Sequence, residues 1–267
     1  MKGMKKMGND VLAGQKQFHL RISKEDIGEY IILAGDPGRI PQIAERFENS
    51  KEISYNREFR VYTGYLCGQK ISAVSTGIGG PSAAIAVEEA VKCGAHTFIR
   101  VGTSGGMALQ VLSGDLVIAT AAVRGDGTSK EYLPHDYPAV ANFAVIEALK
   151  QSAQKLSEDE DGKRFHVGVI QSKDSFYGEL EPETMPMEKV LDDNWNAYLR
   201  CGCLISEMEC ATIFSVGIAR NVRMGAVLTA IWNVERAKRG LSNQNYLDNN
   251  RAIDCAIEAM KTLISNQ

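Results

Sequence analysis

The 267-residue sequence has no apolar run approaching the ~20 residues that a membrane-spanning helix needs. Residues 1–9 are rich in lysine and methionine but have no apolar core, which argues against a signal peptide. The six cysteines follow no zinc-ligand spacing, so we expect reduced thiols and a cytoplasmic protein. The net charge of -3 argues against a general nucleic-acid-binding surface. We therefore expect neither a membrane nor a nucleic acid as partner.

Two nucleotide-binding motifs are also missing. No Gly-Lys-Ser/Thr sequence ends a glycine-rich loop, which excludes a P-loop. The stretch Thr76–Gly80 is glycine-rich but lacks the G-x-G-x-x-G spacing of dinucleotide sites. No repeat or low-complexity linker divides the chain. We expect residues 1–10 to be a disordered N-terminal extension and residues 11–267 to form one domain.

Short apolar segments alternate with stretches of helical periodicity. The strands that we expect lie near residues 30–34, 61–65, 71–75, 98–101, 116–120, 165–171 and 224–232. Helices are expected near residues 40–47, 83–93, 141–156, 188–199, 210–219 and 252–264. This alternation predicts an α/β domain with a largely parallel sheet flanked by helices.

The stretch Phe98–Gly106 is an apolar strand that opens into a loop of small residues and glycines. A parallel strand that ends in such a loop exposes backbone N–H groups to a ligand. Arg100 adds a planar cation with donors suited to a phosphate. We infer either an oxyanion site or an ordinary turn beside a surface arginine.

A second glycine turn, Gly35–Arg39, follows the strand at residues 30–34. Asp36 and Pro37 fit a helix N-cap followed by proline, and a helix N-terminus attracts anions. If Arg39, Arg57 and Arg100 converge, they form a site for a divalent anion. If they do not converge, they are three surface arginines.

Two carboxylates stand at alternate positions just before an expected helix, at Glu207 and Glu209. Carboxylates accept hydrogen bonds from vicinal hydroxyls, so one or both could bind a diol. The alternative is a negative charge that stabilises the helix N-terminus. His19, considered alone, is more simply an exposed histidine.

Six stretches in this order resemble the nucleoside phosphorylase family, and within it the members that act on uridine. They are Gly35–Arg39, Asn56–Phe59, Ser75–Ser82, Arg100–Thr103, Asp174–Tyr177 and Glu207–Glu209. The resemblance covers the chain from about residue 11 to its end. It implies a three-layer α/β/α sandwich with a central, largely parallel mixed sheet.

The resemblance also implies roles for single residues. Gly35, Arg39, Arg100 and Thr103 would hold phosphate, and Arg57 would reach it from a neighbouring subunit. Ribose would be bound by Glu209, by Met208, and by His19 of an adjacent subunit, which would not then be simply exposed. The positions that would contact the base are Gly105, Phe176, Glu179, Glu207 and Asn233.

The expected assembly is a homo-oligomer with a dimer as the active unit, built into a hexamer. Glu58, Ile78 and Ser82 match positions that hold a monovalent cation, such as potassium, between subunits. No cofactor is expected, since phosphate is itself a substrate. The implied catalytic residues are Arg39, Arg57, Arg100, Thr103 and Glu209.

The implied reaction is phosphorolysis, in which uridine and phosphate give uracil and ribose 1-phosphate, making the protein a pentosyltransferase. Glu179 stands where a uracil-reading glutamine is expected, and Thr184 where an arginine is expected. A purine or otherwise altered base is therefore an alternative, although Asn233 resembles the uridine enzymes. A nucleoside-binding protein without catalysis would have lost the phosphate arginines, which are all present.

Overall fold

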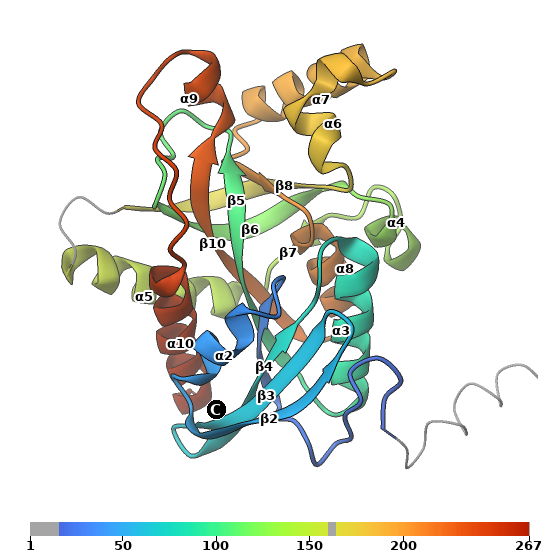
Figure 1. Ribbon diagram of the computed structural model, residues 1–267, viewed down its shortest axis with the longest axis vertical. Coiled ribbons are helices and arrows are strands. Elements are labelled where there is room, and N and C mark those ends of the chain that lie inside the picture. Colours follow the sequence, from blue (N-terminus) through green and yellow to red (C-terminus); the bar gives the residue numbers. More distant parts are fainter. Residues whose placement is uncertain (1–15, 160–163, 267) are drawn as a thin grey trace, which may run out of the picture.

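The computed structural model describes residues 16–159 and 164–266 (Figure 1), so the extension expected at residues 1–10 lies outside the described residues. No helix within the described ranges is long and apolar enough to cross a membrane. The strands are β1 (Tyr30–Ala34), β2 (Glu48–Asn56), β3 (Phe59–Leu66), β4 (Gln69–Ser75), β5 (Thr97–Gly106), β6 (Leu116–Gly125), β7 (Ala139–Val140), β8 (Phe165–Lys173), β9 (Ile205–Glu207) and β10 (Arg223–Asn233).

The helices alternate with these strands along most of the chain. They are α2 (Arg39–Ala44), α3 (Gly80–Lys92), α4 (Thr128–Tyr132), α5 (Phe143–Asp159), α6 (Phe176–Leu180), a 3-10 turn η1 (Pro182–Thr184), α7 (Glu188–Arg200), α8 (Cys210–Arg220), α9 (Val234–Lys238) and α10 (Asn250–Ser265).

Strand β1 lies at the centre of the sheet, between β4 and β5, and is parallel to both. Strand β10 pairs in parallel with the other side of β5. Leu33 stands opposite Arg100 in the β1–β5 register, so the two glycine turns that follow these strands open at the same edge. The sheet becomes antiparallel at its edge, where β3 pairs with β4 and β2 with β3. The expected mixed sheet is confirmed.

The pairings also close a ring at the carboxyl ends of the strands. Strand β10 is antiparallel to β6, β6 is parallel to β8, and β8 is parallel to β9. Strand β9 then returns to the end of β5 through Gly105 and Gly106. This ring brings the ends of β5, β8 and β9 together, although they are far apart in the sequence.

Helices cover both faces of the sheet, as the three-layer architecture requires. Alternate residues of β1 point to opposite faces, with Ile31 and Leu33 in one buried cluster and Ile32 in the other. The first cluster includes residues of α3 and α8, and the second includes residues of α2, α5 and α10. The helices therefore form two layers around the sheet (Figure 1).

Several local features differ from the sequence expectations, among them the short elements α4, α6, β7 and β9, which were not expected. Strand β2 was not expected, because its sequence ENSKEISYN is polar and mostly exposed at the sheet edge. Helix α2 begins at Arg39, with Gly38 as N-cap, whereas Asp36 accepts the Gly38 N–H at 2.7 Å from outside the helix. The short helix α9 (Val234–Lys238) was not expected either.

Candidate active site

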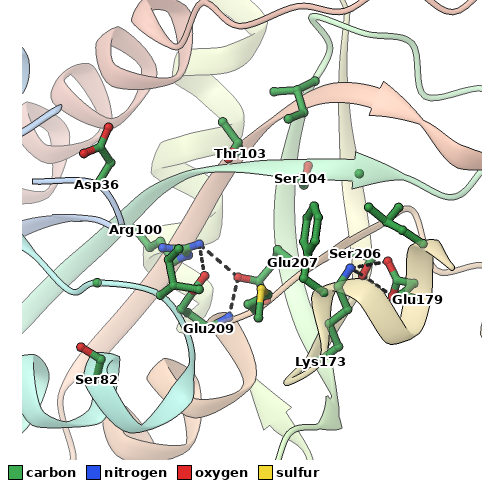
Figure 2. A pocket seen from close by; sticks show the side chains of 18 of the residues that line it. Asp36, Ser82, Arg100, Thr103, Ser104, Lys173, Glu179, Ser206, Glu207 and Glu209 are labelled. Carbon is green, nitrogen blue, oxygen red and sulfur yellow. Dashed lines mark hydrogen bonds and ion pairs between the residues drawn. The ribbon is translucent and has the colours of Figure 1, made fainter. Parts of the chain in front are cut away.

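A cavity of about 700 Å³ opens where the ends of β1, β5, β8 and β9 meet. Residues from turns and helix starts at this edge complete its wall (Figure 2). Most of the site residues expected from the sequence line it, namely Gly35, Arg39, Glu58, Ile78, Ser82, Arg100, Thr103, Gly105, Phe176, Glu179, Glu207, Met208 and Glu209. Open parallel sheets bind ligands at this edge, beyond the carboxyl ends of their strands.

Arg100 projects from β5 into one end of the cavity, with a side chain only 4% exposed. Its Nη2 donates to Glu209 Oε2 and lies 3.3 Å from Glu207 Oε2 (Figure 2). Its Nε and Nη1 are buried and have no hydrogen-bond partner in the described part of the chain. A buried donor without a partner costs about 1–3 kcal/mol, and more when the group is charged. The guanidinium therefore has unused donors, and Nη1 on the side of the Gly35 turn could donate to an anion in the cavity.

Burial opposes the charge of Arg100, but the carboxylates of Glu209 and Glu207 outweigh it and raise the pKa of the guanidinium. The cation therefore persists at every physiological pH. Glycines keep the space around it open. A Cβ at Gly102 would lie 2.9 Å from Nη2, and one at Gly35 would lie 4.0 Å from Nη1. The strand and the β1 turn therefore leave room for the guanidinium and for a ligand beside it.

Arg39 and Thr103 line the same cavity as Arg100. Burial lowers the pKa of Arg39, the nearby Arg100 lowers it further, and Asp36 and Glu209 oppose the shift. Two guanidinium groups that repel each other in a half-buried cavity are stabilised by an anion placed between them. The structure thus brings together two of the three arginines that the sequence left open.

Arg57 is the exception. It is exposed, has a positive φ of 56°, and does not line the cavity of its own chain. His19 also lies away from this cavity. Its backbone N–H and Nδ1 both reach the Glu89 carboxylate, with Nδ1 at 2.7 Å from Oε1. Arg57 was expected to bind phosphate and His19 to bind ribose, each in a neighbouring subunit. Both lie outside the cavity of their own chain.

The two carboxylates that follow β9 have different roles. Glu207 accepts the N–H of Cys210 at 2.9 Å and the N–H of Glu209 at 2.9 Å, which satisfies the start of α8. It also accepts the Ser172 hydroxyl. Glu207 thus performs the helix-stabilising role that the sequence left as an alternative. Glu207 also lines the cavity, and its expected contact with the base stays a prediction.

Glu209 also lines the cavity, and fewer donors of the fold occupy its carboxylate. Its Oε1 accepts the Gly79 N–H at 2.6 Å, and its Oε2 accepts from Arg100. Burial raises the pKa of its carboxyl group against the opposing effect of Arg100, and the nearby Glu207 raises it further. The carboxylate has lone pairs left for donors in the cavity, as a ribose diol would require. Glu209 therefore stands between the anion-binding end and the rest of the cavity.

The other end of the cavity carries Phe176 and Glu179, both from helix α6. The Ser175 hydroxyl caps this helix by accepting the Gly178 N–H at 3.0 Å. Phe176 is half-exposed, so its ring is available to stack on a base. Glu179 is not free. It pairs with the Lys173 ammonium, and its Oε2 accepts from the Ser206 hydroxyl at 2.8 Å (Figure 2).

The sequence reasoning missed Lys173 and Ser206. Lys173 is the last residue of β8, and Ser206 lies on β9. The two strands pair in parallel, with Gln171 opposite Ser206. Lys173 Nζ donates to Ser206 Oγ at 2.8 Å. The alternation along β8 could have indicated that a polar residue at its carboxyl end faces the site. The short β9 gave no such signal, since its three residues, Ile205–Glu207, form no apolar run.

Asn233 does not reach the cavity, contrary to its expected role at the base. Its Nδ2 donates to the carbonyl groups of Ala108 and Val111, both at 2.9 Å. Its Oδ1 accepts the Arg236 N–H at 2.9 Å and caps α9. The amide is fully buried and its hydrogen-bonding capacity is used within the fold. Thr184, the expected position of an arginine, is exposed and also lies outside the cavity.

The expected cation ligands lie at the cavity wall beside Glu209. Ser82 Oγ donates to Glu58 Oε1 at 3.0 Å and to the Thr76 carbonyl at 2.5 Å. Ile78 is 76% exposed, as an interface residue in a single chain would be. The donor set is one carboxylate, one hydroxyl and backbone carbonyls, which are the hard oxygen ligands that alkali cations accept. Within the described residues, no cluster of three or more His, Cys, Asp or Glu could hold a metal.

The fold and this cavity place the chain in a known class. It belongs to the phosphorylase superfamily, whose family model matches residues 29–264. It is similar to a uridine phosphorylase of Treponema pallidum, with 48% identity over 93% of this chain and 95% of that one. A uridine phosphorylase of Thermococcus kodakarensis is 41% identical over 81% of this chain and 77% of that one. A guanosine phosphorylase of Halorubrum lacusprofundi is 37% identical over 82% of this chain and 84% of that one.

Proposed function

We propose that the protein is a uridine phosphorylase, which converts uridine and inorganic phosphate into uracil and ribose 1-phosphate. The observation that carries the proposal is the pair of buried, unpartnered donors on Arg100, placed next to the Glu209 carboxylate in one cavity. An oxyanion beside a diol-binding carboxylate is the arrangement that phosphorolysis of a nucleoside needs. The names of the relatives from Treponema and Thermococcus support uridine as the nucleoside.

Phosphate is proposed to bind between Arg100, Arg39, Thr103 and the Gly35 backbone. Nη1 of Arg100, which faces the Gly35 turn, would donate to a phosphate oxygen. Arg39 would neutralise the second negative charge, and the phosphate would in turn relieve the repulsion between the two guanidinium groups. Thr103 would add a hydroxyl donor. The dianion would then lie beside the sugar carbon that it attacks.

The ribose is proposed to lie over Glu209 and Met208. The Glu209 carboxylate accepts from the 2′- and 3′-hydroxyls, which only an ionised carboxylate can do for two donors at once. Met208 lines the cavity next to it and would pack against the sugar. This places the anomeric carbon between the phosphate and the base.

As the bond between the sugar and the base breaks, positive charge develops on the sugar ring. The phosphate dianion and Glu209 stabilise that charge at short range in a cavity with restricted water. Arg100 pairs with both anions, so it sets the position of one relative to the other. The chain's contribution is thus the orientation of fixed charges around the reacting carbon.

We propose that Arg57 and His19 complete the site of a neighbouring subunit, in a dimer that assembles into a hexamer. Their location outside this chain's own cavity supports that proposal. Glu58, Ser82 and the Ile78 backbone are proposed to hold a monovalent cation at the same dimer interface, with potassium as the expected ion. The cation would fix the interface and would take no part in the reaction.

Guanosine is the second candidate nucleoside. The 37% identical relative from Halorubrum carries the name guanosine phosphorylase, and Glu179 is a carboxylate rather than an amide. A test separates the two candidates by supplying phosphate with uridine, cytidine, inosine or guanosine in parallel. Release of ribose 1-phosphate fastest from uridine supports the proposal. Release from guanosine alone would replace uridine by a purine.

A further inference from the structure

At the end of the cavity away from Arg100, a lysine, a glutamate and a serine contact one another (Figure 2). Lys173 Nζ donates to Glu179 Oε1 and to Ser206 Oγ, and Ser206 Oγ donates to Glu179 Oε2. The side chains of Lys173 and Glu179 are only 12% and 8% exposed. Three separate elements, β8, β9 and α6, supply them. The fold therefore holds this triad rigidly against the cavity.

The triad still has hydrogen-bonding capacity on its cavity side. A lysine ammonium has three N–H donors, and the described residues accept two from Lys173. Each Glu179 oxygen accepts one hydrogen bond and can accept another. The Phe176 ring lies beside the ammonium, with Nζ 5.8 Å from the ring centroid. A planar base stacked on Phe176 would thus meet a donor and an acceptor side by side.

We propose that Lys173 and Glu179 together read the edge of the base, an inference that rests on uridine as the substrate. Uracil presents a carbonyl oxygen next to N3–H, which matches one donor and one acceptor. The Lys173 ammonium donates to the carbonyl, and Glu179 accepts N3–H. The pair performs the two functions that a single glutamine amide would combine. Cytosine presents an amino group and an unprotonated N3 at the same edge, so it meets both groups with the wrong polarity.

The same cation assists bond cleavage. A phosphate oxygen forms a bond to C1′ while the C1′–N1 bond breaks, and the bonding electron pair leaves with the base. That pair is delocalised onto the carbonyl oxygens of uracil, where the Lys173 charge stabilises it. The proton of the attacking hydrogen phosphate passes through solvent to the uracil anion, which leaves as neutral uracil. Lys173 is therefore a residue for catalysis as well as for specificity, and Ser206 is a positioning residue.

The experiment compares Lys173→Met with the control Lys189→Met. Lys189 is a highly exposed lysine that pairs with Asp193 on α7 and does not line the cavity. We expect Lys173→Met to lower kcat/KM for uridine about 100-fold or more, because one preorganised donor is lost from the transition state. The defect should be smaller for 5-fluorouridine, whose base leaves more readily. Lys189→Met should stay within about twofold of the wild type, as a surface change does.

Removing one partner of a buried ion pair can unfold a protein, so a double variant is needed. Lys173→Met/Glu179→Met leaves no unpaired charge and should retain the fold while losing uridine turnover. Glu179→Gln alone should lower uridine turnover and narrow the preference for uridine over cytidine. If Glu179 acted without Lys173, Glu179→Gln would be expected to increase uridine turnover. Such an increase would contradict the proposal that Lys173 and Glu179 bind the base together.

Uracil binding to the same variants separates this inference from the proposed function. Loss of uracil affinity in Lys173→Met, with unchanged phosphate affinity, supports the base-reading role. Equal uracil affinity in both lysine variants, or an equal defect with uridine and 5-fluorouridine, overturns it. A wild-type protein that does not cleave uridine at all would instead contradict the proposed function.

Discussion

Arg100 and Glu209 are joined by a hydrogen bond between side chains 109 residues apart in the sequence. The pair leaves two Arg100 donors without a partner in the described ranges, and it leaves Glu209 with free lone pairs. One buried cation thus links the phosphate end of the cavity to the sugar end.

The first prediction concerns the geometry of the Arg100 guanidinium. Arg100→Lys keeps the positive charge beside Glu209 and Glu207, so the protein should fold. It loses the Nε and Nη1 donors of the guanidinium, and we expect the KM for phosphate to rise about tenfold or more. Steady-state kinetics with varied phosphate measures this. Arg220→Lys is the control, because Arg220 pairs with Glu88 at the surface. An unchanged phosphate KM in Arg100→Lys would contradict the phosphate site.

The second prediction concerns pH. Glu209 must be ionised to accept two ribose hydroxyls, and burial raises its pKa above the usual value of 4.5. Activity should therefore fall as pH decreases through that raised pKa, at a higher pH than an exposed glutamate would give. Glu209→Gln should lower kcat/KM about 100-fold and change the acidic limb, which then reflects only protonation of the phosphate dianion. A full pH profile of both proteins measures it, and an identical acidic limb in the variant would exclude Glu209 as its source.

Raising the pH has opposite effects on the two properties: ionisation of Glu209 increases activity but decreases the stability of the fold. A carboxyl group whose pKa is raised on folding binds its proton more tightly in the native state. Its contribution to stability is present below the unfolded pKa and is lost as pH rises through the folded pKa. The stability of the wild type relative to Glu209→Gln should therefore decrease with pH across that window. Urea unfolding at several pH values measures this difference.

The third prediction concerns Asn233, which the structure places outside the cavity. Asn233→Ala removes the cap of α9 and leaves the carbonyls of Ala108 and Val111 unpaired. We expect a loss of about 2–4 kcal/mol in the free energy of unfolding. The ratio of uridine to inosine turnover should not change. A changed ratio in a variant of unchanged stability would return Asn233 to the base-binding residues.

The fourth prediction tests the shared site. Arg57→Ala and Glu209→Gln should each be nearly inactive as pure proteins. If Arg57 acts on the neighbouring subunit, a mixed dimer contains one site with both native residues. Co-expression of the two variants should then restore about a quarter of wild-type activity. The absence of any recovery in a mixed oligomer would place Arg57 in its own subunit's site or outside catalysis.

Much of the fold could be predicted because its central strands are continuous apolar runs. The segment Tyr30–Ala34 is buried on both faces, and such runs are characteristic of parallel sheets. The edge strand β2 could not be predicted, since a polar exposed strand has no periodic signal and depends on its partner β3. The ring through β9 could not be predicted either, because a three-residue strand is defined by its neighbours.

The phosphate end of the site was predictable because glycine turns and arginines follow strands that a parallel sheet brings to one edge. The base end was less so. Glu179 and Lys173 are six residues apart, and Ser206 joins them only through the β8–β9 pairing. The residue type alone also does not reveal which partners a side chain contacts. Glu207 and Glu209 are the same residue type two positions apart and both line the cavity, yet only Glu207 accepts the N–H groups at the start of α8.

The most direct test of the central claim is a product analysis with uridine, carried out with and without inorganic phosphate. The wild-type protein should release uracil and ribose 1-phosphate in equal amounts, and only when phosphate is present. Arg100→Lys should require much more phosphate for the same rate. Uracil released without phosphate, or no product from uridine at any phosphate concentration, would contradict uridine phosphorolysis.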